Sequence, residues 1–101
     1  MKIIWSPRAI KRLDELFAWL KEKSDKSAIA IYNDLFDSVK LLEDFPSLAP
    51  IEPILSHLNR TYRSLVIRNN YKVVYYTEGS FIYISTVWDC RQNPKKLKHD
   101  L

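Results

Sequence analysis

A proline-rich stretch, residues 45–55, divides the chain into two halves in which the apolar residues are spaced differently. In the first half, apolar residues recur at helical spacing over residues 7–23 and again over residues 26–44, which predicts two helices. Ser6 followed by Pro7 is typical of a helix start, because serine caps the backbone and proline fits the first helical position. The short polar link between the two segments predicts an antiparallel helix hairpin.

After the prolines, apolar and polar residues alternate, as they do along strands with one buried face. The alternation covers three segments, residues 62–68, 71–78 and 81–89. Asn69-Asn70 separates the first two, and asparagine tolerates the left-handed backbone that a two-residue hairpin turn needs. With a turn signal at Gly79, this pattern predicts three sequential antiparallel strands, a meander. Residues 2–5, which are β-branched and aromatic, predict a further strand before the first helix.

The predicted order of elements, β-α-α-β-β-β, favours one α+β domain spanning residues 1–101. A helix hairpin and a meander, each with one apolar side, can bury both surfaces by packing together. We therefore expect a two-layer fold, with the helix hairpin on one face of an antiparallel sheet and the other face open to solvent or to a partner. Pro94 ends the last strand, and the residues after it are expected to form at most one helical turn and a frayed end.

Composition indicates a folded globular chain and excludes several classes of protein. Apolar residues make up 47% of the chain and charged residues 28%. Cys90 is the only cysteine, so no internal disulfide can form, and no Cys/His cluster predicts a metal site. The sequence has no glycine-rich phosphate loop, and we expect no cofactor. No signal peptide is recognisable and no apolar stretch is long enough to span a membrane, so we expect a cytoplasmic protein.

Charge is distributed unevenly along the chain. Residues 1–12 carry four basic and no acidic side chains, residues 13–59 carry four basic and nine acidic ones, and residues 60–101 carry eight basic and three acidic ones. The middle of the chain is therefore acidic and both ends are basic. If the two ends meet in space, they form a positive surface that suits a phosphate-rich partner.

Alternation predicts which side chains share a face of the sheet. Arg63 belongs to the row of Leu65 in the first meander strand, and Arg91 extends the row of Val87 in the last one. The same alternation places Ile84 on the face opposite Val87. Arg63 and Arg91 therefore each end an otherwise apolar row, at the rim of the sheet.

Seven basic residues of the second half are candidates for phosphate binding. They are Arg60, Arg63, Arg68, Lys72, Arg91, Lys95 and Lys96. The planar fork of a guanidinium group suits phosphate oxygens. Exposed arginines are common, however, so spacing alone favours an ordinary surface or ion-pair role for each arginine and a solvated role for the tail lysines.

Three segments together resemble the RelE/ParE superfamily of bacterial toxins. They are the opening IIWSPRAIKRLDEL, the hairpin YRSLVIRNNYKVVYY and the closing ISTVWDCRQNP. The resemblance covers nearly the whole chain and includes the order of elements. It implies a toxin of a type II toxin–antitoxin system, whose partner is a cognate antitoxin that wraps it with a helix or a strand.

The resemblance leaves three functions open. RelE-like members cleave messenger RNA on the ribosome, and this branch implies that Arg63 and Arg91 bind the scissile phosphate, with the other candidate cations adding RNA contacts. It therefore requires the two guanidinium groups to converge at one end of the sheet. ParE-like members instead poison DNA gyrase, and a third possibility is a member that only binds its antitoxin. We expect the ribosome-dependent endoribonuclease first and the gyrase inhibitor as the alternative.

Overall fold

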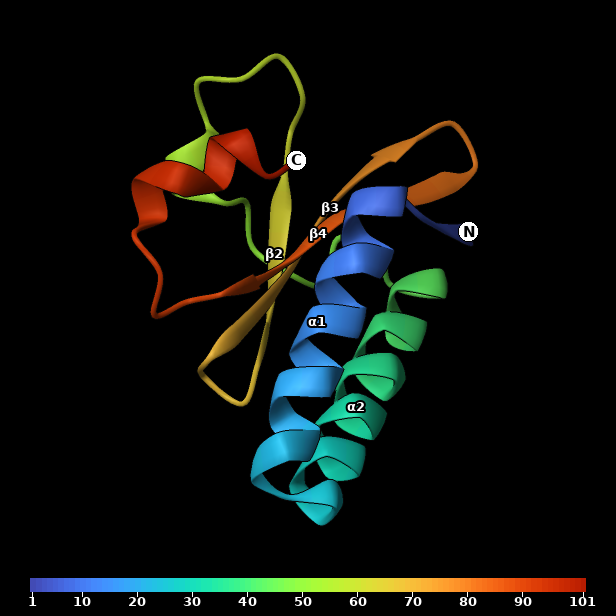
Figure 1. The fold of residues 1–101 in the computed structure, drawn as a ribbon. Coiled ribbons are helices and arrows are strands. Elements are labelled where there is room, and N and C mark those ends of the chain that lie inside the picture. Colours follow the sequence, from blue (N-terminus) through green and yellow to red (C-terminus); the bar gives the residue numbers. More distant parts are fainter.

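The computed structural model describes residues 1–101, and its first half is the predicted helix hairpin. Helix α1 covers Pro7–Lys23 and helix α2 covers Asp25–Lys40, followed by a short 3-10 turn. Ser24 links them, because its backbone N–H donates to the Leu20 carbonyl at the end of α1 and its hydroxyl accepts a hydrogen bond from the Ser27 N–H in the first turn of α2. This one-residue link makes the two helices antiparallel, and they lie side by side (Figure 1). Neither helix is both long and apolar enough to cross a bilayer.

The sheet has four strands in the order β1-β4-β3-β2. Their bounds are Lys2–Trp5 for β1, Arg63–Ile67 for β2, Tyr71–Glu78 for β3 and Phe81–Asp89 for β4. Strands β2, β3 and β4 form the predicted antiparallel meander, whereas β1 lies parallel to β4. The predicted α+β class is confirmed, and the sheet is mixed rather than wholly antiparallel.

The turn between β2 and β3 lies one residue earlier than predicted. Arg68 and Asn69, not Asn69 and Asn70, adopt the left-handed conformation, with φ of 49° and 61°. The Asn70 N–H donates to the Ile67 carbonyl at 3.3 Å and closes the turn. Two consecutive left-handed residues suit the twist of a hairpin, which explains why this pair connects the strands.

A β-bulge in β4 changes which side chains face the helices. Val74 pairs with Thr86 and Tyr75 pairs with Ile84, so Ser85 has no partner on β3. The extra residue reverses the alternation, and Ile84 and Val87 therefore both enter the core under the helices. The prediction that they lie on opposite faces was wrong for this reason. The Ser6 hydroxyl donates to the Ser85 carbonyl at 2.9 Å and ties the bulge to the start of α1.

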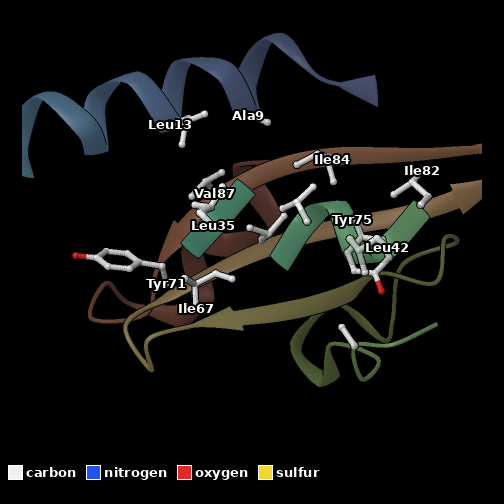
Figure 2. Packing of buried hydrophobic residues seen from close by; sticks show 13 residues of the cluster. Ala9, Leu13, Leu35, Leu42, Ile67, Tyr71, Tyr75, Ile82, Ile84 and Val87 are labelled. Atoms are coloured by element: carbon white, nitrogen blue, oxygen red, sulfur yellow. The ribbon is translucent and has the colours of Figure 1, made fainter. Parts of the chain in front are cut away.

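The main core lies between the helix hairpin and the sheet, where thirteen buried residues form one cluster. Leu35 of α2 and Ile82 and Ile84 of β4 are all fully buried there (Figure 2). Tyr75 is also fully buried, and its hydroxyl donates to the Pro46 carbonyl at 2.8 Å. That hydrogen bond satisfies the phenol while fixing the proline-rich stretch to the edge of the core.

The other face of the sheet is covered as well, contrary to the prediction that it stays open. Two 3-10 turns, Pro53–Leu55 and Pro94–His99, pack together on it, away from the helices (Figure 1). A second apolar cluster lies beneath them, made of Leu55, Tyr62, Val74, Trp88 and Leu97. The predicted frayed end is also wrong, because Leu97 is only 1% exposed and holds the C-terminal turn in place.

Asp100 fastens this C-terminal turn to the rest of the fold and is 5% exposed. Its carboxylate accepts hydrogen bonds from Arg8 at 3.0 Å, from Arg12 at 2.6 Å and from the Thr86 hydroxyl at 2.6 Å. Burial alone would raise the pKa of Asp100, but the hydrogen bonds from Arg12, Thr86 and Arg8 lower it on balance. The carboxylate thus joins the end of the chain to α1 and β4.

Replacing Leu35 tests the position of the main core. Leu35→Ala is expected to lower the free energy of unfolding by about 2–5 kcal/mol, because it leaves a cavity under α2. Ile29→Ala is the matched control, since Ile29 lies on the same helix but is 54% exposed; a change below about 0.5 kcal/mol is expected for it. Urea unfolding of the wild type and both variants measures the two changes. Equal losses for the two variants would contradict the orientation of α2 described here.

Replacing Asp100 tests the C-terminal attachment. Asp100→Asn is expected to lower the free energy of unfolding by about 2 kcal/mol near neutral pH, because charge-assisted hydrogen bonds are lost. The folded-state pKa is lowered, so this contribution is present above the ordinary Asp pKa of about 4 and disappears as pH falls through the folded-state value. Urea unfolding of both proteins across this range measures the difference.

Glu15→Gln is the control for Asp100→Asn, because Glu15 is an exposed partner of the same Arg12 side chain. Its removal is expected to change the free energy of unfolding by less than about 0.5 kcal/mol. A difference between the wild type and Asp100→Asn that persists undiminished in strong acid would contradict the role given to the carboxylate.

Candidate functional site

Arg63, the first residue of β2, lies at one end of the sheet beside the proline-rich stretch. Its Nη1 donates to the Ala49 carbonyl at 2.8 Å. Arg60 lies nearby, and both arginines line an open polar hollow together with Tyr76 and Glu78. The Arg60 guanidinium stacks over the Tyr76 ring at 4.3 Å. This end of the sheet therefore carries two cations, each already in contact with the protein.

Arg91, just after β4, belongs to a different group of side chains. Its guanidinium donates to both carboxylate oxygens of Asp89 at 2.9 Å and lies over the rings of Trp19 and Tyr71, 5.5 and 5.7 Å from their centroids. The hydrogen bond from Arg91 lowers the pKa of Asp89. The Arg91 side chain is still 52% exposed, and Trp19 is 43% exposed. The pair of Trp19 and Arg91 thus presents an aromatic and a cationic surface to solvent.

The two predicted catalytic arginines do not converge. Arg63 pairs with Tyr75 in the middle of β3, whereas Asp89, next to Arg91, pairs with Tyr71 at its start, so the two arginines lie beside different parts of β3. Figure 2 shows Tyr71 and Tyr75 well apart along that strand. Four residues of strand correspond to about 13 Å, and two strand spacings separate β2 from β4 by about 10 Å. The prediction of convergence was wrong because β2 and β4 run in the same direction, so the start of one lies far from the end of the other.

Two more of the predicted phosphate-binding residues form ion pairs with carboxylates of the protein. Arg68 forms an ion pair with Asp34 of α2 across the surface. Lys72 binds Glu52, which is 2% exposed and also accepts a hydrogen bond from the Ser64 hydroxyl at 3.0 Å. Burial would raise the pKa of Glu52, but hydrogen bonds, chiefly from Lys72, lower it on balance. Arg68 therefore attaches the β2–β3 turn to α2, and Lys72 attaches the inner strand β3 to the proline-rich stretch.

The tail lysines have different surroundings. Lys96 lines an open groove between α1 and the C-terminal turn, whereas Lys95 lies outside it. The residues that line the groove are Arg8, Arg12, Trp88, Gln92, Lys96, His99 and Asp100. Six of these, all except Lys96, were not among the candidates, because no local pattern marks them. The sequence feature that could have indicated these lining residues is the basic charge at both ends of the chain.

The distribution of these groups favours contact with a large partner over chemistry in an enclosed cleft. Cations lie at both ends of the sheet and along one edge, and each hollow is open. The exposed side chains of Arg91 and Trp19 are of the residue types that dominate protein–protein contacts. In this structure the guanidinium of Arg63 donates to the Ala49 carbonyl and that of Arg91 to Asp89, so each is engaged by the protein at a separate place.

Comparison with known proteins identifies the family. A model of the ParE toxin of the type II toxin–antitoxin system parDE matches residues 3–94. Among solved structures, a chain of the chromosomal ParDE toxin–antitoxin system from P. aeruginosa is similar, with a TM-score of 0.71, 19% identity, and coverage of 88% of this chain and 95% of that chain. No curated protein sequence gives a significant match. Because the family model covers nearly all of the sequence, the chain belongs to the ParE family of toxins of type II toxin–antitoxin systems.

Proposed function

We propose that this chain inhibits DNA gyrase in the cytoplasm and that a cognate antitoxin neutralises it. The observation that carries the proposal is the match of the ParE model to residues 3–94, because the resemblance links ParE-like toxins to gyrase. The separation of Arg63 from Arg91 supports the same branch of the superfamily. An inhibitor of this kind needs a surface that holds its target and does not need a site that breaks a bond.

The endoribonuclease expected first from the sequence has less support. It depended on two guanidinium groups that stabilise the same scissile phosphate, and such groups must lie within hydrogen-bond distance of it. Arg63 lies beside the middle of β3 and Arg91 near its start, and each donates to an acceptor of the protein itself. The ParE match also favours the alternative.

We place the contact with gyrase at Arg91 and Trp19, because Tyr71 beneath them is only 3% exposed. Tryptophan, tyrosine and arginine are the residues that most often dominate binding energy at interfaces. Asp89 holds the Arg91 guanidinium in one orientation, so little side-chain entropy is lost when a partner binds it. Half of the Arg91 side chain remains exposed for that contact.

The purified toxin is expected to inhibit the supercoiling of relaxed plasmid by gyrase in proportion to its concentration. Cellular messenger RNA is expected to keep its ordinary 5′ ends on ribosomes after the toxin is induced. Both measurements are needed, because growth arrest alone fits either branch. New 5′ ends within coding sequences, together with unaffected gyrase, would overturn the proposal in favour of the nuclease.

Arg91→Ala is expected to raise the toxin concentration for half-maximal inhibition of gyrase by at least about tenfold, equivalent to about 1.4 kcal/mol. Arg68→Ala is the matched control, because both side chains are about equally exposed, at 52% and 47%, and each pairs with one carboxylate. We expect less than about a twofold change for it, since exposed ion pairs contribute little to stability. Equal effects of the two substitutions would rule out the proposed contact.

A further inference from the structure

The two basic ends of the chain meet at one edge of the sheet. Strand β1 pairs with β4 only as far as Ile84, so on the side of β4 away from β3 no strand lies beside Ser85 and the residues that follow it. The C-terminal turn reaches α1 across this edge, where Asp100 accepts hydrogen bonds from Arg8 and Arg12. The sequence predicted a shared positive surface if the two basic ends of the chain meet in space, and in the structure they do meet.

An open groove of about 400 Å³ lies between α1 and the C-terminal turn, and Trp88 is its only apolar lining residue. Three permanent cations line it, Arg8, Arg12 and Lys96, against one carboxylate, Asp100. Glu15, outside the groove, also pairs with Arg12, so the three cations exceed the two carboxylates by one positive charge. His99 and Gln92 add further polar atoms to its rim.

The two arginines have different amounts of unused hydrogen-bonding capacity. Arg12 directs Nε and Nη2 to Asp100 and Nη1 to Glu15, so its guanidinium is largely committed to the protein. Arg8 directs only Nη1 to Asp100, and its side chain is 44% exposed. A guanidinium has five N–H donors, so Arg8 retains donors that can face a ligand. Asp100 thus holds the Arg8 side chain in place and leaves some of its N–H donors free.

We propose that this groove binds phosphate groups of a nucleic-acid backbone, with Arg8, Lys96 and His99 as the contacting side chains and Arg12 and Asp100 as positioning residues. Guanidinium and ammonium groups are the usual donors to backbone phosphates. An array of cations on an open edge provides the sequence-independent electrostatic attraction that nucleic-acid binding uses.

An acidic protein segment is a less suitable occupant. The central part of a protein interface is usually apolar or aromatic and depleted in lysine. Here Trp88 is only 5% exposed, and the other lining residues are of charged or polar types. The proposal goes beyond inhibition of gyrase and does not depend on it, because binding to nucleic acid is measured without gyrase present.

The test compares two neighbouring lysines of the same turn. Lys96→Gln removes a charge inside the groove, and Lys95→Gln removes one outside it. Fluorescence anisotropy of a labelled short DNA duplex is measured with the purified full chain between about 50 and 200 mM salt. We expect Lys96→Gln to weaken binding about fivefold and to reduce the salt slope by about 1, and Lys95→Gln to change affinity less than about twofold.

Further ligands and variants distinguish the sources of phosphate. His99→Gln should also weaken duplex binding, whereas Lys98→Gln, outside the groove, should not. Single-stranded RNA of equal length, in place of the duplex, shows which nucleic acid binds more tightly, and preference for either supports the site. Equal losses from substitutions inside and outside the groove, no binding of either nucleic acid, or tighter binding of an acidic peptide than of the duplex would each overturn the proposal.

Discussion

One buried carboxylate, that of Asp100, joins three parts of the chain that are far apart in sequence. It binds Arg8 and Arg12 of α1 and Thr86 of β4. The bulge at Ser85 lies beside this point, where Ser6 also attaches the start of α1 to β4. The C-terminal turn is held over the second face of the sheet as a result. Without this attachment, the apolar cluster under that turn would lose one of its two covering segments.

Because both faces of the sheet are covered, functional groups remain only at its ends and along its edge. Arg63 lies at one end, Arg91 at the other, and the groove around Lys96 lies along β4. These positions suit binding to a large partner at several points. Groups spread over several positions are consistent with a toxin of the ParE family. A compact catalytic centre would need them at one place.

The helices were predictable because their signals are local. Ser6 and Pro7 start α1, and a regular apolar stripe continues to Lys23, where the helix ends as predicted. The bulge at Ser85 was not predictable, because alternation carries no mark of an unpaired residue. The burial of Asp100 depends on partners about ninety positions earlier in the chain, which no local pattern reveals.

The separation of the two arginines could have been predicted. A meander of three antiparallel strands makes its first and third strands run in the same direction. Arg63 starts the first of them and Arg91 follows the end of the third. The resemblance to nucleases drew attention to the residue types, whereas the predicted topology already set their positions. The candidate residues were therefore correctly located on their strands but wrongly expected to meet.

A double-mutant cycle on Arg63 and Arg91 tests the central claim, that they act at separate places, most directly. Gyrase inhibition and growth arrest are measured for Arg63→Ala, Arg91→Ala and the double variant, with the loss expressed as a free energy. Residues this far apart, with no shared partner, should give losses that add to within about 0.5 kcal/mol. A double variant no worse than the more impaired single one, when both single variants are impaired, would show that the two arginines serve one site and would contradict the account.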